Sequence, residues 1–371
     1  MKDPFISEIP FSKFSIWNKP KTGKEKLVAF DLEITTRCNN NCRHCCVNVP
    51  ARDKKAKAKE LTYIEIKNIV DQAADLGVLS CLITGGEPLL REDFFDIYLY
   101  IKKKGILVSV FTNATLITDK HIRFFKKYSP RNIEVTVYGV TRETYECVTR
   151  RSGSFGLFIQ GLNLLLNSGI KVQLKTVAIR SNIHELPQIA RFCRSRSQGN
   201  FFFDPVLNLR FDRNQKRNKE IISERLSPEE IMAVEKAYSV RSQVLGGNLD
   251  KNLIPDTSRS ADTNLFRFRC GSGSFSVGHD GKFKLCRILV HPDCMYDLKK
   301  GSVQKAYAEF ALQVRDMRSQ NLKFLNRCHT CELLDNCFYC PAQSYLETGE
   351  LDAPAEYFCD IVRAIHLNNH R

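Results

Sequence analysis

Six short apolar runs alternate with amphipathic segments between residues 27 and 206. The runs are rich in β-branched residues and have the length of strands, whereas the segments between them have the pattern of helices. The alternation predicts six strand–helix units, with strands at 27–34, 78–84, 106–112, 132–138, 170–177 and 201–206.

The ends of the predicted helices carry recognisable signals. Thr62, followed three residues later by Glu65, has the form of a capping box at the start of the first helix. Glycines stand between the ends of four helices and the strands that follow, where a left-handed residue commonly ends a helix: Gly77, Gly105, Gly169 and Gly199. Alternating strands and helices predict a parallel sheet, and six units predict an α/β fold with a partial (β/α)6 TIM-type barrel.

The patterning divides the chain into four parts. We expect an N-terminal extension at 1–26, the barrel at 27–206 and a polar linker at 207–261. The linker contains a helix predicted at about 227–244, which begins with Ser227 and Pro228. Residues 262–371 are predicted to form a small, loop-rich, cysteine-rich domain organised by metal.

Composition places this fold in a reducing compartment. The 371 residues include 15 cysteines, yet no secretory signal or membrane-spanning apolar run precedes or interrupts the barrel. We therefore expect a cytoplasmic protein without membrane contact, in which clustered cysteines bind metal rather than form disulfides. The scattered Cys81, Cys147 and Cys193 are interpreted as small buried hydrophobes.

The net charge of +15 suggests an acidic partner. Lysine and arginine concentrate at 52–59 and 210–225, although solvated loops of a basic protein would have the same composition. No aromatic RNP strand or basic heptad helix accompanies this charge, so nucleic-acid binding is disfavoured.

The first chemical motif follows the first predicted strand. Cys38, Cys42 and Cys45 have a C-x3-C-x2-C spacing on one short loop. Three thiolates can hold three irons of a [4Fe–4S] cube and leave the fourth iron open, whereas ferredoxin clusters and structural zinc sites take four ligands. Zinc remains an alternative, with Cys46 as a possible fourth ligand.

Further polar motifs follow the next three strands. Gly85-Gly86-Glu87-Pro88 comes after the second strand, where glycines allow close approach of a ligand and the carboxylate can hold an ammonium group. A plain tight turn is the alternative. Thr112 and Asn113 follow the third strand and Thr136 ends the fourth, so all lie at the edge where parallel barrels collect functional residues.

The cluster loop, the GGEP turn and their positions resemble the radical S-adenosylmethionine (SAM) superfamily. The resemblance covers roughly residues 27–206 and implies that Cys38, Cys42 and Cys45 ligate a [4Fe–4S] cluster whose open iron binds SAM. It also implies a set of SAM contacts at His44, Gly85, Gly86, Glu87, Pro88, Thr112, Asn113 and Thr136. Glu33, Lys175 and Asp204 are expected to be structural polar residues of the barrel interior.

The C-terminal cysteines resemble the SPASM extension of radical SAM enzymes, which carries two auxiliary iron–sulfur clusters. Two CxxC pairs alone would also fit a zinc ribbon. By resemblance one cluster is held by Cys328, Cys331, Cys337 and Cys359, and the other by Cys270, Cys286 and Cys340. Two residues separate Cys337 from Cys340, where the family usually has three, and the second set lacks one obvious ligand, which Cys294, another side chain or the substrate would supply.

These resemblances imply a radical SAM/SPASM enzyme that oxidatively matures a peptide or protein side chain. A peptide substrate, a separate leader-binding protein and a flavodoxin or ferredoxin electron donor are the expected partners. The alternative within the enzyme class is oxidation or rearrangement of a small molecule, such as a sugar alcohol or a tetrapyrrole. A non-catalytic zinc or iron–sulfur protein that binds nucleic acid is the alternative from another class.

Overall fold

The computed structural model describes residues 27–197, 201–238, 273–328, 330–333, 337 and 340–369. The N-terminal extension, Gly199, Cys270 and the second half of the predicted linker lie outside these residues.

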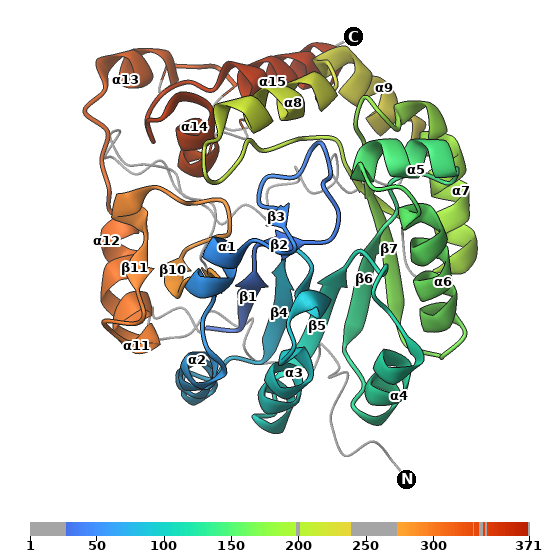
Figure 1. The fold of residues 1–371 in the computed structure, drawn as a ribbon. Helices are drawn as coiled ribbons and strands as arrows, with labels where there is room; N and C mark the ends of the chain where they lie inside the picture. The colour runs from blue at the N-terminus through green and yellow to red at the C-terminus, as the bar shows by residue number, and fades with distance from the viewer. Residues whose placement is uncertain are drawn as a thin grey trace.

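Six parallel strands form the barrel wall (Figure 1). Each lies within about two residues of a predicted one, so the predicted α/β partial barrel is confirmed. In sheet order they are β1 (Ala29–Thr35), β4 (Ser80–Gly85), β5 (Leu107–Thr112), β6 (Asn132–Thr136), β7 (Val172–Val177) and β8 (Phe202–Asp204).

Amphipathic helices cover the outer face of this sheet (Figure 1). They bury Leu32, Ile83 and Leu174 completely between helix and strand. The predicted capping box of Thr62 and Glu65 is present at the start of the first barrel helix. The covering helices are α2 (Tyr63–Asp75), α3 (Phe94–Lys103), α4 (Asp119–Lys127), α6 (Ser154–Leu166) and α7 (Leu186–Arg196). Helix α5 (Arg142–Thr149) lies at the carboxyl ends of the strands, where the carbonyls of its last two residues accept from the backbone N–H groups of Asn41 and Arg43.

The sheet continues beyond β1 into the C-terminal part of the chain. Strand β9 (Ser274–Val277) pairs in parallel with β1, and the antiparallel strands β10 (Lys282–Lys284) and β11 (Tyr296–Asp297) follow it. Phe275 of β9 stacks on Phe30 of β1 with ring centroids 5.3 Å apart. The domain boundary at residue 262 stays a prediction. The sheet contains strands from both sides of that residue.

The described part of the linker, residues 207–238, holds two helices where the sequence predicted one. Helix α9 (Pro228–Ala237) begins as predicted, with Ser227 and Glu230 forming a capping box, and the predicted helical residues 239–244 lie outside the described residues. Helix α8 (Gln215–Glu224) was missed because it is almost wholly polar and buries only one apolar residue, Ile221.

The described part of the C-terminal region carries short helices. These are α11 (Val303–Lys305), a π-helical turn η6 (Ala306–Phe310), α12 (Ala311–Arg315), α13 (Leu322–Cys328), α14 (Pro341–Thr348) and α15 (Glu356–Asn369). The shorter elements of the chain are β2 (Arg37–Cys38), β3 (Val49–Pro50), α1 (Lys54–Lys59), η3 (Pro88–Leu90), η4 (Ile183–Glu185) and η5 (Pro292–Cys294).

Burial and charge bear on two further predictions. Cys81 and Cys193 are buried, as predicted. Cys147 is exposed because its side chain in α5 points away from the core, so the prediction that Cys147 is buried was wrong.

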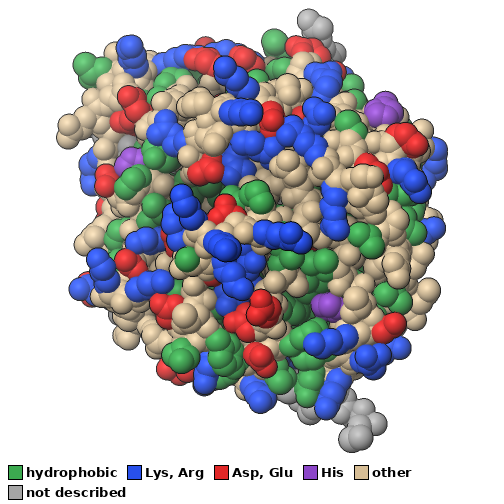
Figure 2. Space-filling model, viewed as in Figure 1, with side chains coloured by type: hydrophobic (Ala, Val, Ile, Leu, Met, Phe, Trp, Pro, Cys, Tyr) green, Lys and Arg blue, Asp and Glu red, His purple; other side chains and the backbone are tan. Residues whose placement is uncertain are grey.

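Lysine and arginine side chains gather over α1 and α8 on one face (Figure 2). Within the described residues, no helix has the length and apolar character needed to cross a bilayer.

Candidate functional site

The three motif cysteines share one loop at the carboxyl end of β1. Cys42 is buried, and Cys38 and Cys45 are half-buried. Burial, together with the charges of the nearby Glu87 and Cys45, raises the pKa of Cys38 to about 12. The pKa of Cys42 is likewise raised by burial and then by Cys38 and Cys45. The three sulfurs are therefore close enough to repel one another as thiolates, which a bound cationic metal group would offset.

Unpartnered polar atoms lie in the same loop. The side-chain nitrogen and oxygen of Asn40 and Nδ1 of His44 are buried without a hydrogen-bond partner. Among the described residues, no three His, Cys, Asp or Glu side chains converge tightly enough to hold a single metal ion. A cube places each thiolate on a different iron, so its ligands stand farther apart. Three thiolates on one loop, beside buried polar atoms without a partner, fit a [4Fe–4S] group that leaves one iron open.

The two glycines of the GGEP turn allow it to approach the cluster loop. A Cβ atom at Gly85 would lie 2.0 Å from the carbonyl oxygen of Thr35, and one at Gly86 would lie 2.2 Å from that of Arg37. The backbone N–H groups of Gly86 and Glu87 donate to these same carbonyls, at 2.7 and 2.8 Å. The glycines thus fasten the end of β4 to the chain that enters the cluster loop.

Glu87 is completely buried and joins two strand ends. Its carboxylate accepts hydrogen bonds from the backbone N–H of Leu89 (3.1 Å), the Thr112 hydroxyl (2.8 Å) and the backbone N–H of Asn113 (2.8 Å). Burial raises the pKa of Glu87 to about 7, although the three hydrogen bonds act in the opposite direction. The side chain therefore supports both η3 and the turn after β5.

Asn113 carries the connection on to the cluster loop. Its Nδ2 donates to Oδ1 of Asn39 at 2.9 Å and lies 3.8 Å from Sγ of Cys38. Its Oδ1 accepts from the Thr115 hydroxyl at 2.6 Å, and Asn39 in turn donates to that hydroxyl at 2.8 Å. The predicted residues Glu87, Thr112 and Asn113 thus form one buried network that ends at a motif sulfur.

His44 closes the other side of the loop. Its ring lies 5.2 Å from that of Tyr138, which follows β6. Burial lowers the pKa of His44 to about 4, with a further contribution from Arg217, so the ring is neutral near pH 7. Thr136, half-buried at the end of β6, and Pro88, buried at the start of η3, lie at the same end of the barrel.

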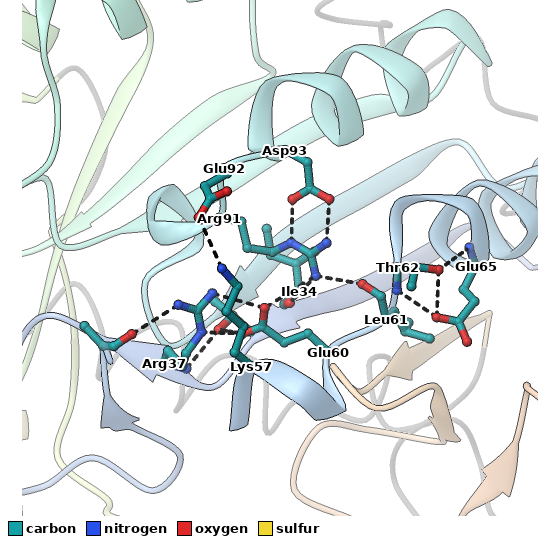
Figure 3. Close-up of polar contacts among 12 residues, drawn as sticks. Ile34, Arg37, Lys57, Glu60, Leu61, Thr62, Glu65, Arg91, Glu92 and Asp93 are labelled. Atoms are coloured by element: carbon teal, nitrogen blue, oxygen red, sulfur yellow. Dashed lines mark hydrogen bonds and ion pairs between the residues drawn. The ribbon is translucent and has the colours of Figure 1, made fainter. Parts of the chain in front are cut away.

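Buried charges anchor the chain that enters the cluster loop (Figure 3). Arg37, immediately before Cys38, forms a two-point ion pair with Glu60 at 2.7 and 3.1 Å. Arg91 lies 3.9 Å from the same carboxylate and holds Asp93 through two hydrogen bonds of 2.8 and 2.6 Å. The start of the loop is therefore tied to the segment between α1 and α2 and to the start of α3.

A second set of ion pairs lies inside the barrel. Glu33 of β1 is buried and pairs with Lys284 and with Arg287, each at 3.2 Å. Lys175 of β7 pairs with Glu134 of β6 at 2.8 Å. Glu33 and Lys175 thus have ion-pair partners, and Glu33 links the barrel to the chain beside Cys286.

The described C-terminal cysteines gather in two places. Burial, together with the charges of Cys359, Cys337 and Cys331, raises the pKa of Cys328 to about 11, so these four sulfurs are neighbours. Burial, together with the charges of Asp293 and Cys286, raises the pKa of Cys294 to about 12.

Comparison with known proteins identifies the family. Residues 32–193, which hold the cluster loop and the GGEP turn, match the Radical SAM superfamily. These residues are a radical SAM domain. The predicted resemblance to this superfamily, whose enzymes use SAM and a [4Fe–4S] cluster, is confirmed for this part of the chain.

Relatives of this chain have different named activities. The AdoMet-dependent heme synthase of Methanosarcina barkeri is 30% identical over 165 residues, which cover 44% of this chain and 46% of the synthase. The chain thus spans less than half of that relative's length. The mycofactocin maturase MftC of Mycobacterium tuberculosis is 24% identical over 341 residues, which cover 90% of this chain and 83% of MftC.

Solved structures share the fold. SuiB of Streptococcus suis bound to S-adenosylmethionine superposes with a TM-score of 0.66 at 15% identity, covering 90% of this chain and 77% of SuiB. SuiB bound to its precursor peptide SuiA gives 0.64 at 16% identity, with 91% and 76% covered. This likeness supports the partial barrel.

Several residues of the site escaped sequence analysis. Asn39, Asn40 and Thr115 join the motif residues only through contacts between distant segments, and Arg37 acts through a buried ion pair. The run of three asparagines between Cys38 and Cys42 was the only local signal for this network. The structure brings together Cys38, Cys42, Cys45, Glu87, Thr112 and Asn113, whereas Cys270 lies outside the described residues.

Proposed function

We propose that Cys38, Cys42 and Cys45 hold a [4Fe–4S] cluster and that the chain uses it to cleave SAM. The observation that carries this proposal is the grouping of the three sulfurs on one loop beside unpartnered polar atoms of Asn40 and His44. When bound, the cluster and SAM supply an electron and a 5′-deoxyadenosyl radical that removes a hydrogen atom from the substrate.

The protein's own part is to hold these groups and exclude water. Asn113 and Asn39 orient the Cys38 side of the loop through their shared hydrogen bonds. The neutral ring of His44, backed by Tyr138, offers a flat surface and a free Nδ1 for the adenine. The GGEP turn, Thr112 and Thr136 supply polar groups for the methionine and ribose parts, as the resemblance implies.

Removal of the three thiolates tests the core of the proposal. Cys38→Ala, Cys42→Ala and Cys45→Ala combined should remove about four irons per chain from protein purified without oxygen, and should abolish 5′-deoxyadenosine formation. Cys81→Ala and Cys193→Ala, two buried cysteines away from the loop, serve as the control and should retain both. Formation of 5′-deoxyadenosine by the triple variant would overturn the proposal.

The C-terminal cysteines are proposed to hold two auxiliary clusters. The neighbouring sulfurs of Cys328, Cys331, Cys337 and Cys359 support one four-cysteine site. Cys286 and Cys340, with Cys270, would hold the other, and the proximity of Cys294 to Cys286 supports Cys294 as its additional ligand. In that arrangement total iron should reach about twelve per chain.

We propose a peptide or protein side chain as the substrate. MftC, a maturase by name, aligns with nearly the whole chain, and a SuiB structure contains a precursor peptide. The exposed lysines of α1, which carries no buried residue, support an acidic leader segment. A leader-binding protein and a flavodoxin or ferredoxin donor belong to this proposal.

The identity to heme synthases favours a second candidate, oxidation of a tetrapyrrole. Incubation with SAM, reductant and either a precursor peptide or an iron–porphyrin separates the two. Substrate-dependent 5′-deoxyadenosine formation and a mass loss should appear with the peptide. The same result with only the porphyrin would favour the second candidate.

A further inference from the structure

The segment that follows β8 lies against the far end of the cluster loop. Leu207, Leu209 and Ile221 pack with Val148 and Leu346, so this connector lies between the barrel and α14. The backbone N–H of Phe211 donates to the carbonyl of Cys46 at 3.0 Å. Residues 207–225 lie outside the part that matches the Radical SAM superfamily, which ends at residue 193.

Arg210 of this connector is buried, with its side chain only 4% exposed. Its Nη1 donates to the backbone carbonyl of Asn48 at 2.9 Å and to Oδ1 of Asn48 at 3.2 Å, with a longer 3.5 Å contact to the carbonyl of Cys45. Its Nε and Nη2 grip the Asp212 carboxylate at 2.9 and 2.6 Å. One edge of the Arg210 guanidinium therefore pairs with Asp212 of the connector, and the other edge donates to the cluster loop.

Arg217, on the first turns of α8, repeats this arrangement. Its Nη2 donates to the carbonyl of Cys42 at 2.8 Å and to Oδ1 of Asn48 at 3.3 Å. Its Nη1 pairs with Glu220 at 2.6 Å. Two arginines thus converge on Asn48 while reaching the backbone of two motif cysteines.

The geometry of these arginines matters beside their charge. Asp212 offsets the charge of Arg210, whereas Arg217 shares Glu220 with Arg150, which lies 3.0 Å from the same carboxylate. Each guanidinium is a rigid fork that donates in two directions at once, which a lysine ammonium cannot reproduce. These paired contacts fix the position of the cluster loop.

We infer that Arg210 and Arg217 are positioning residues that hold the cluster loop through the carbonyls of Cys42 and Asn48. This inference rests on the proposed cluster at Cys38, Cys42 and Cys45. Outer contacts of this kind are commonly worth 10- to 100-fold in metal affinity when removed. The connector would thus help retain the cluster without touching it.

Arg225 provides a matched control on the same connector. It is buried to a similar degree, with its side chain 8% exposed, and it too pairs with a carboxylate, Glu347 of α14. It also donates to the carbonyl of Leu207 at 2.8 Å, but no hydrogen bond joins it to the described cluster loop. Arg225→Met removes a buried arginine of equal size while leaving the loop contacts in place.

Two measurements test the inference on the full chain. In iron-free protein, hydrogen exchange of the amides at 41–48 should be at least about tenfold faster in Arg210→Met than in wild type or Arg225→Met. In reconstituted protein, a chelator should remove the SAM-responsive part of the reduced EPR signal about 10 to 100 times faster from Arg210→Met. SAM binds one cluster only, so this part of the signal reports the loop.

The outcomes separate the two proposals. If wild type shows no SAM-responsive signal, the proposed cluster fails. If wild type shows it and Arg210→Met matches Arg225→Met in both measurements, the positioning inference is wrong. Arg210→Lys, which keeps the charge and loses the fork, should resemble Arg210→Met, and wild-type behaviour would overturn the inference. If Arg210→Met does not fold, Arg217→Gln carries the same test, because that side chain is 17% exposed.

Discussion

Glu87 shows how one side chain can serve the fold and the site together. The sequence pattern predicted a carboxylate aimed at an ammonium group, and the structure gives that carboxylate three protein donors. These donors leave lone pairs on both oxygens, so the expected SAM contact stays a prediction. The nearest route from Glu87 to a motif sulfur runs through Asn113.

Glu87→Gln separates these two roles. The amide NH2 cannot accept a hydrogen bond, so either the Asn113 or the Leu89 N–H loses its partner. We expect the free energy of unfolding of the iron-free chain to fall by about 1–3 kcal/mol. If the carboxylate also holds the SAM ammonium, SAM affinity of the reconstituted protein should fall by about one to two orders of magnitude.

Denaturant unfolding and equilibrium SAM binding measure the two effects of Glu87→Gln independently. A loss of stability without any loss of SAM affinity would contradict the ammonium contact and leave the side chain as support for the turn. Thr118→Val, which alters the cap of α4 and removes no hydrogen bond of Glu87, provides a control for stability alone.

Most of the site residues that sequence analysis identified belong to short motifs of neighbouring residues. The cysteine spacing and the GGEP turn are local patterns, and their chemistry could be inferred from residue type. The hydrogen-bond network joins Asn39 to Asn113 and Thr115, which lie about seventy-five positions away in the sequence, so no local pattern predicts it. Arg210 was counted only as part of a basic stretch, because burial distinguishes a structural arginine from a solvated one and burial depends on the whole fold.

At the scale of elements, the same contrast between local and distant signals holds. The barrel strands and the capped starts of α2 and α9 follow from periodicity and caps within a few residues. The pairing of β9 with β1 joins segments far apart in the chain, and α8 folds without an amphipathic stripe because its contacts are ion pairs and hydrogen bonds. Neither could be derived from a local pattern.

The chain around α1 offers a test of element anchoring. Glu60, directly after α1, has its side chain 7% exposed and pairs with Arg37 at the entrance to the cluster loop. Glu60→Ala leaves a buried guanidinium without its partner, so the free energy of unfolding should fall by about 3–5 kcal/mol. Denaturant unfolding of the iron-free chain measures this change.

Glu92→Ala is the matched control for the anchoring test. Glu92 pairs with Lys57 of α1, but its side chain is 89% exposed, and exposed pairs contribute at most about 1 kcal/mol. Equal losses in the two variants would show that the buried pair does not anchor the loop.

At the scale of the molecule, the structure divides the two predicted basic stretches. Arg210, Arg217 and Arg225 of the 210–225 stretch are held by carboxylates and backbone carbonyls. The lysines of α1 remain exposed, apart from the surface pair of Lys57. On α8, Lys216 and Lys219 are also exposed, but α1 carries four exposed lysines. Any long-range attraction of an acidic leader should therefore depend on α1 more than on α8.

Charge reversal on α1 tests that attraction. Lys54→Glu, Lys55→Glu and Lys59→Glu together should raise the apparent KM for a precursor peptide with an acidic leader. Uncoupled SAM cleavage should stay unchanged. In wild type, precursor turnover should fall as salt increases, since exposed charges are screened over about 8–10 Å.

Reversal of three exposed lysines on the outer helices, Lys103, Lys120 and Lys126, is the control for net charge. An equal rise in KM with that control would attribute the effect to overall charge rather than to α1. Turnover that responds to neither variant nor salt would remove the support for an acidic leader and move the small-molecule substrate ahead of the peptide.

The parallel pairing of β9 with β1 has a consequence for biosynthesis. A ribosome adding about 5–20 residues per second needs on the order of ten to fifty seconds to pass from β1 to β9. Throughout that interval the outer edge of β1 has no strand to pair with. Asp31 and Glu33 place two acidic side chains on the nascent edge, and inward-facing charges are a known deterrent to wrong strand pairing. Lys284 of β10, which is synthesised just after β9, then forms an ion pair with Glu33. The unpaired charge of Glu33 therefore opposes wrong strand pairing only while the edge of β1 is open.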